Sequence, residues 1–114
     1  MSNANIVRSI LAATLCLTGG AAFAQSSTGT ITVSKIRTGW STDMFAVVPV
    51  GAIINPANCV YADGYVSLSP APGYQTFLSA ALTAFALDTP VAVSVNDTAC
   101  AANRPMIIGI ELLR

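Results

Sequence analysis

Cysteine is the residue type with the clearest chemical potential in this sequence, because it occurs three times while histidine is absent. A catalytic thiol needs a nearby base or cation, and a mixed zinc site needs histidine beside cysteine. Cys59 and Cys100 stand apart from Cys16, which lies in an apolar N-terminal segment. Cys59 and Cys100 therefore predict either a disulfide or a reactive thiol, and the compartment decides between them.

The N-terminal segment has the order of a Sec signal peptide. A basic residue, Arg8, precedes an apolar run over 10–17, and Ala22-Phe23-Ala24 forms an A-x-A site. The run is too short to span a bilayer. We expect residues 1–24 to be a signal peptide cleaved after Ala24, which removes Cys16 and places the protein in the periplasm or outside the cell.

We then expect residues 25–114 to form a single domain in an oxidising compartment. Two cysteines in a small exported domain favour one disulfide, Cys59 to Cys100. In the chain-entropy model a bridge of that span stabilises the fold by about 4 kcal/mol. A reactive thiol at Cys59 is the alternative.

Other catalytic chemistry finds little support. A serine nucleophile would need Lys35 as its base, and a lone lysine on a strand is usually a solvated charge. The acidic residues are single and scattered, which disfavours a glycosidase pair or a metal cage. They are Asp43, Asp63, Asp88, Asp97 and Glu111. We therefore expect no enzyme activity, cofactor or metal.

Charge also limits the partners. Without Arg8 the chain has four basic residues against these five acidic ones, a balance that disfavours nucleic acid or an anionic membrane as partner. Charged residues make up 9% of the whole sequence and apolar residues 54%. A surface so poor in charge suggests that part of it is buried in an assembly.

Three strands are expected in the first half of the domain. In "TGTITVSKIRTGW", Ile31 and Val33 alternate with polar residues, and Ile36 breaks the alternation as a bulge would. "DMFAVVPVG" is the second strand, with Pro49 confining it to an edge or an end. "CVYADGYVSLS" is the third, with Asp63-Gly64 as an internal turn or bulge or, alternatively, a tight hairpin.

A helix and two strands complete the domain. Residues 74–87 have helical periodicity, and their opposite face is small and uncharged. The strands begin at Val91 and Met106, and a polar loop over 96–105 holds Cys100. The apolar stripe expected to face the core is Tyr74, Phe77, Leu78, Ala81, Leu82 and Phe85.

The expected fold class is mainly β with one helix. Three strands, a helix and two strands predict a five-stranded OB-fold-like barrel with the helix between strands 3 and 4. A generic α+β sandwich would give a similar string of elements.

The chain resembles a family of exported OB-fold proteins, the B subunits of subtilase-cytotoxin and typhoid-toxin type. The resemblance covers Gly29 to Leu113 and rests on "GTITVSKIRTG", the Cys59 strand, "FLSAALTAF", "VAVSV" and the Cys100 loop. It implies a ring-shaped homo-oligomer, commonly a pentamer, whose helices line the central pore. The candidate oligomer interface is then the uncharged helix face, Gln75, Thr76, Ser79 and Thr83.

The resemblance further implies binding of sialylated glycans near the first strand. The corresponding positions are Ser27, Thr28 and Gly29, and Lys35 and Arg37 offer basic partners for a carboxylate. Trp40, in the loop-like "TGWSTD", is a further candidate. Tyr61 and Tyr65 are aromatic residues that could also face a ligand, but their expected place on one strand face favours core or interface packing. The alternatives are a structural or accessory exported protein without a small ligand, and a domain that inhibits a periplasmic enzyme.

Overall fold

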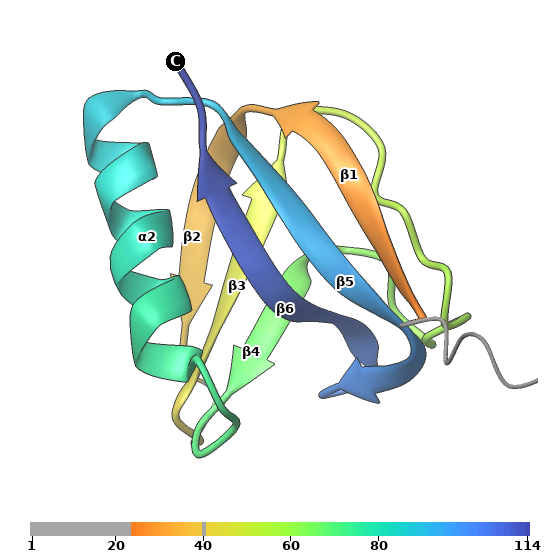
Figure 1. Cartoon of the computed structure of the whole chain (residues 1–114). Helices are drawn as coiled ribbons and strands as arrows, with labels where there is room; N and C mark the ends of the chain where they lie inside the picture. The colour runs from red at the N-terminus through yellow and green to blue at the C-terminus, as the bar shows by residue number, and fades with distance from the viewer. Residues whose placement is uncertain (1–23, 40) are drawn as a thin grey trace, which may run out of the picture.

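The computed structural model describes residues 24–39 and 41–114, which form a curved sheet with one helix packed against it (Figure 1). The predicted signal peptide therefore lies outside the described residues except for Ala24, and so does Trp40. The elements are β1 (Gln25–Ile31), β2 (Val33–Thr38), β3 (Met44–Pro49), β4 (Tyr65–Leu68), α2 (Tyr74–Leu87), β5 (Val91–Ala101) and β6 (Arg104–Leu112).

The strands form one sheet in the order β1-β5-β6-β4-β3-β2. Neighbouring strands are antiparallel except β4 and β6, which are parallel. The two strands at the ends of this order, β1 and β2, are consecutive in the chain and are separated by Thr32 alone. The chain thus joins one end of the sheet directly to the other.

A mainly β fold with one helix and one disulfide is confirmed, but the expected five strands are wrong. The described residues form six strands, and the helix follows the fourth instead of the third. The reason is that the expected first strand changes partner at Thr32, pairing with β5 before it and with β3 after it. The Thr32 carbonyl accepts a hydrogen bond from the Val50 N–H, at 2.9 Å.

The bulge predicted from Ile36 is confirmed. The β2–β3 register shifts between Val33 and Lys35, so that Val33 and Ile36 both reach the core although three positions separate them. Val33 is buried, and Ile31 packs against the same cluster from β1.

The expected third strand is much shorter than its sequence suggested. Only Tyr65–Leu68 is a strand, and residues 50–64 form a loop. The Asn55 side chain accepts a hydrogen bond from the Cys59 N–H and donates one to the Cys59 carbonyl, both at 2.8 Å. Because a side chain already satisfies these backbone groups, this segment does not need a neighbouring strand.

The polar loop expected over 96–105 is also wrong. β5 continues through Cys100 to Ala101, and Cys100 pairs with Pro105 of β6. The turn is reduced to Ala102 and Asn103, whose φ angles of 49° and 61° suit a tight two-residue hairpin.

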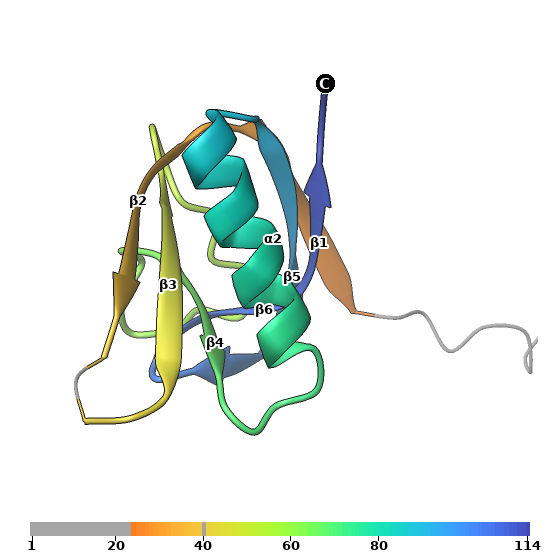
Figure 2. The ribbon, with the colours of Figure 1, turned by 90° about the vertical axis from the view of Figure 1, so that its left-hand side faces the viewer.

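The main core lies between the sheet and α2 (Figure 2). As the alternation predicted, one face of β5 is buried there, with Val91, Val93 and Val95 at most 1% exposed. β3 is buried on both faces, since Phe45 and Val47 face this core while Met44 and Ala46 join a second cluster that includes Val66. That double burial explains its unbroken apolar run.

The helix is rotated relative to the predicted stripe. Tyr74, Phe77 and Leu78 pack against the core, but the two fully buried residues of α2 are Ala81 and Ala84. Leu82 and Phe85, both expected in the core, are 47% and 48% exposed. The two small alanines point at the sheet, so the larger side chains flank the contact and reach solvent.

Candidate functional site

A cluster of charged side chains gathers around Asp63, in the loop before β4. Arg104 Nε at the start of β6 lies 2.6 Å from Asp63 Oδ1, and Arg37 Nη2 on β2 lies 3.4 Å from the same oxygen. Arg37 also donates to the Asp63 carbonyl at 2.8 Å. Gly64 permits this approach, because a Cβ there would lie 3.1 Å from Arg37 Nη2.

Tyr61 completes this cluster, which we call the Asp63 cluster: Arg37, Tyr61, Asp63 and Arg104. The Arg104 guanidinium lies 4.9 Å from the centre of the Tyr61 ring, in cation–π contact, and Arg104 Nη1 donates to the Ala102 carbonyl. Tyr61 remains 50% exposed. An exposed aromatic ring and carboxylate and two partly buried guanidinium groups therefore lie together at the surface.

The electrostatics of the cluster keep Asp63 ionised. The hydrogen bond from Arg104 is the main cause that lowers the pKa of Asp63, with the charges of Arg104 and Arg37 adding to it and burial opposing it. The hydrogen bond to Asp63 likewise raises the pKa of Arg104. Because the folded pKa of Asp63 lies below its unfolded value, its stabilising contribution exists above the unfolded pKa and is lost as the pH falls through the folded one.

The Cys59–Cys100 disulfide, which is confirmed, anchors the loop that carries Tyr61 and Asp63. Its Cα atoms are 5.9 Å apart, and it joins the loop before β4 to the end of β5. The Tyr61 N–H adds a hydrogen bond to the Asn103 carbonyl at 2.9 Å. A free reactive thiol at Cys59 is therefore wrong, since its sulfur is bonded.

The structure does not gather the predicted ligand residues into one site. Ser27 and Thr28 lie on β1, where the β1–β5 register shifts, whereas Lys35 and Arg37 lie on β2. Thr28 Oγ1 accepts the Val93 N–H at 3.0 Å, so its hydroxyl takes the place of a backbone acceptor. Arg37 alone among them belongs to the Asp63 cluster.

Sequence reasoning did not place Asp63 and Arg104 in a site, and it favoured packing over ligand contact for Tyr61. Asp63 and Arg104 are 41 positions apart and meet only because β4 and β6 are neighbours. Tyr61 and Tyr65 were expected on one strand face, but Tyr61 lies in the loop while Tyr65 is fully buried. The small number of charged residues in the sequence was the one feature that could have drawn attention to Asp63 and Arg104.

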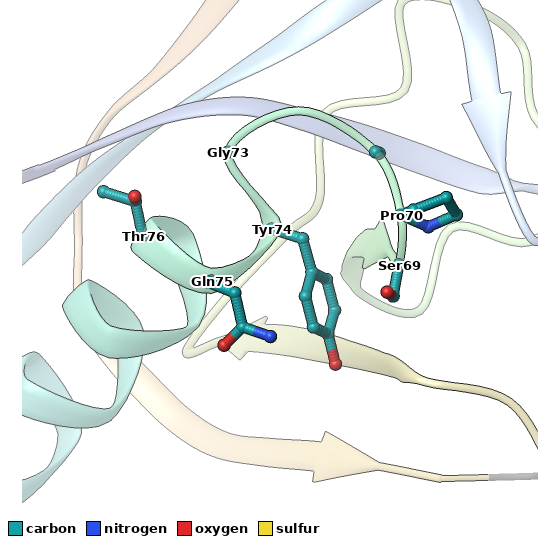
Figure 3. A pocket seen from close by; sticks show the side chains of 7 residues that line it. Ser69, Pro70, Gly73, Tyr74, Gln75 and Thr76 are labelled. Atoms are coloured by element: carbon teal, nitrogen blue, oxygen red, sulfur yellow. The ribbon is translucent and has the colours of Figure 1, made fainter.

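A separate hollow of about 310 Å³ lies where the chain enters α2 (Figure 3). The polar ends of Ser69, Tyr74 and Gln75 are directed to one side of the segment, while Thr76 points the other way. Its lining residues are Ser69, Pro70, Ala71, Gly73, Tyr74, Gln75 and Thr76.

The outward surface of α2 lacks charge throughout, because the helix contains no acidic or basic residue. Leu82, Phe85 and Leu87 are 47%, 48% and 69% exposed. All four predicted interface residues are exposed: Gln75, Thr76, Ser79 and Thr83. The Thr83 hydroxyl donates a hydrogen bond to the Ser79 carbonyl. We call the exposed residues Ser79, Leu82, Thr83, Phe85 and Leu87 the outer helix surface.

Comparison with known proteins assigns this chain neither a family nor a function. No family model matches the chain, and no curated protein is significantly similar to it. Within residues 24–39 and 41–114, no helix is long and apolar enough to cross a membrane. The described residues contain no group of three or more side chains suited to hold a metal ion.

Proposed function

We propose that this chain is an exported, non-catalytic binding subunit of OB-fold type that recognises glycans and assembles as a ring-shaped homo-oligomer, similar to toxin B subunits. The strand order supports the fold part of the proposal. If β1 and β2 are counted as one strand bent at Thr32, the elements become three strands, a helix and two strands. That is the element order of the OB-fold barrel.

The Asp63 cluster is the observation that carries the binding function. Arg37 precedes the loop between β2 and β3, and Arg104 follows the turn between β5 and β6. In OB-folds these two connections border the surface that binds oligonucleotides and oligosaccharides. The exposed Tyr61 ring suits the apolar face of a sugar, and the ionised Asp63 accepts hydrogen bonds from hydroxyl groups.

Glycan binding is expected to depend on Tyr61 and Asp63. On a glycan array, Tyr61→Ala and Asp63→Asn should each lower the signal about tenfold or more, because each removes a direct sugar contact. Wild-type binding should persist at mildly acidic pH, since the low pKa keeps Asp63 charged. Val50→Ala, which truncates another exposed apolar side chain in the same loop, serves as the matched control.

A structural or accessory protein without a small ligand is the second candidate. The Arg104 side chain donates hydrogen bonds to both Asp63 carboxylate oxygens and to the Ala102 carbonyl. This geometry favours the second candidate, because it is sufficient to hold the loop over 50–64 in place without a ligand. A blank array with folded wild-type protein would select this candidate over glycan recognition.

The outer helix surface supports the assembly part of the proposal. We expect native mass spectrometry of residues 25–114 to show an oligomer at micromolar concentration, and Leu82→Lys with Phe85→Lys to yield monomers, because the added charges would have to be desolvated at the contact. The control is Val60→Lys, which alters an exposed apolar residue outside the helix. A wild-type monomer, or an oligomer that tolerates both lysines, would contradict the ring.

A further inference from the structure

We propose that the hollow at the entrance to α2 is a second ligand site, separate from the Asp63 cluster, and that it binds one neutral, hydroxyl-rich ring such as a hexose. The ligand is held by the Tyr74 ring and by hydrogen bonds from Gln75 and Ser69. This inference needs neither the ring assembly nor the glycan site of the proposed function, because it rests on a different segment of the chain.

The walls of the hollow are fixed by backbone hydrogen bonds. The Ser69 N–H donates to the Asp43 carbonyl, and the Ala71 N–H donates to the Leu68 carbonyl, both at 2.8 Å. The Tyr74 N–H donates to the Ala71 carbonyl at 3.2 Å. The segment is therefore held in place before any ligand arrives, as is usual for small-molecule sites.

Tyr74 provides an oriented aromatic surface. Its ring packs against Phe45 of the core, with the ring centres 5.6 Å apart and the planes inclined by 54°. Tyr74 is only half-buried, so part of the ring borders the hollow. A ring held by the core costs little entropy to use as a contact for the C–H face of a sugar.

The polar groups beside this ring match alternating hydroxyls. The amide of Gln75 both donates and accepts hydrogen bonds, and so do the hydroxyls of Ser69 and Tyr74. Figure 3 shows these three polar ends on the same side of the segment. A ligand whose neighbouring groups each donate and accept would pair with all three.

Size and charge select the ligand class. A hollow of about 310 Å³ is at the small end of ligand sites, which suits one pyranose ring better than an extended peptide. None of its lining residues is charged, whereas carboxylate and phosphate ligands are typically held by arginine or lysine. The lining side chains therefore favour a neutral sugar, while the uncapped start of α2 is the one feature that would favour an anion, which the anionic probes below test.

The test is a nuclear magnetic resonance titration of ¹⁵N-labelled residues 25–114. The probes are methyl β-galactopyranoside, methyl α-mannopyranoside and N-acetylglucosamine, with N-acetylneuraminate and inorganic phosphate as anionic arms. At least one neutral sugar should shift the Gln75 side-chain amide and the backbone of residues 73–76, with a Kd of about 1 mM or weaker for a ligand of this size. Gln75→Ala should weaken this binding about tenfold, and Tyr74→Phe about threefold.

Gln25→Ala, which removes an exposed side-chain amide on β1 far along the chain from the hollow, should leave the affinity unchanged and is the matched control. The proposal is overturned if no neutral sugar shifts these resonances, if only the anions do, or if Gln75→Ala binds as well as the wild type. Shifts confined to Tyr61 and Arg104 would overturn it too, while supporting the Asp63 cluster as the glycan site. The two proposals thus fail separately.

Discussion

Replacing both bonded cysteines, Cys59→Ala with Cys100→Ala, should lower the free energy of unfolding by about 2–5 kcal/mol. The bridge spans 41 positions, so its loss restores a large conformational freedom to the unfolded chain. It also removes the covalent link between the loop over 50–64 and the β5–β6 hairpin. For a domain of this size that effect is a large share of the total stability.

Urea unfolding of the oxidised protein and of the double variant measures this difference. The wild type in the presence of a reductant is the control, and its stability should approach that of the variant. Amide hydrogen exchange locates the effect: the Tyr61 N–H, bonded to the Asn103 carbonyl, should lose protection before the amides of β3. A loss of stability below about 1 kcal/mol would contradict the assigned role of the bridge.

Features that depend on local periodicity were predictable from the sequence. The alternation of Val91, Val93 and Val95 identified the buried face of β5, and the break at Ile36 identified the bulge in β2. The cysteine pair was predictable by count. Each of these inferences uses residues that are close in sequence or few in number, so no knowledge of the packing was needed.

The segment before β4 was not predictable, because a side chain overrides its β propensity. Valine and tyrosine at positions 60 and 61 favour a strand, but Asn55 binds the backbone of Cys59 and holds the chain in a loop. The division of the expected first strand between two partner strands was not predictable either. The change at Thr32 depends on where β3 and β5 lie, and no local pattern encodes that position.

The helix illustrates how far a periodic pattern can be trusted. Its apolar stripe was wide enough to allow several rotations, and the rotation observed places Ala81 and Ala84 against the sheet. Side-chain volume explains this rotation, since the small side chains of Ala81 and Ala84 let the helix approach the sheet closely. Leu82 and Phe85 consequently expose apolar surface, although the periodicity alone placed both residues in the core.

The candidate site was even less accessible to sequence reasoning. Arg37, Asp63 and Arg104 come from β2, a loop and β6, and only the sheet order brings them together. Of the residues expected to bind ligand from β1, Thr28 accepts a hydrogen bond from the Val93 N–H at the irregular β1–β5 register. The Thr28 hydroxyl thus satisfies a backbone donor of β5, whereas the charged residues of the Asp63 cluster come from other elements.

Tyr65 should produce the other large effect, and two substitutions separate its contributions. It is fully buried, and its hydroxyl accepts the Ile54 N–H at 3.0 Å. Tyr65→Ala should cost about 3–5 kcal/mol of unfolding free energy, because it leaves a cavity between the sheet and α2. Tyr65→Phe keeps the ring but leaves the Ile54 N–H without its acceptor, at a cost of about 1–3 kcal/mol.

The pH dependence of urea unfolding distinguishes the hydroxyl from the ring. Burial raises the pKa of Tyr65 above its usual value, with the Ile54 hydrogen bond opposing that shift. The neutral hydroxyl therefore stabilises the fold fully below the unfolded pKa of about 10, and this contribution is lost as the pH rises through the folded pKa. The stability difference between the wild type and Tyr65→Phe should then shrink above about pH 10, whereas a difference that stays constant would contradict the raised pKa of the buried phenol.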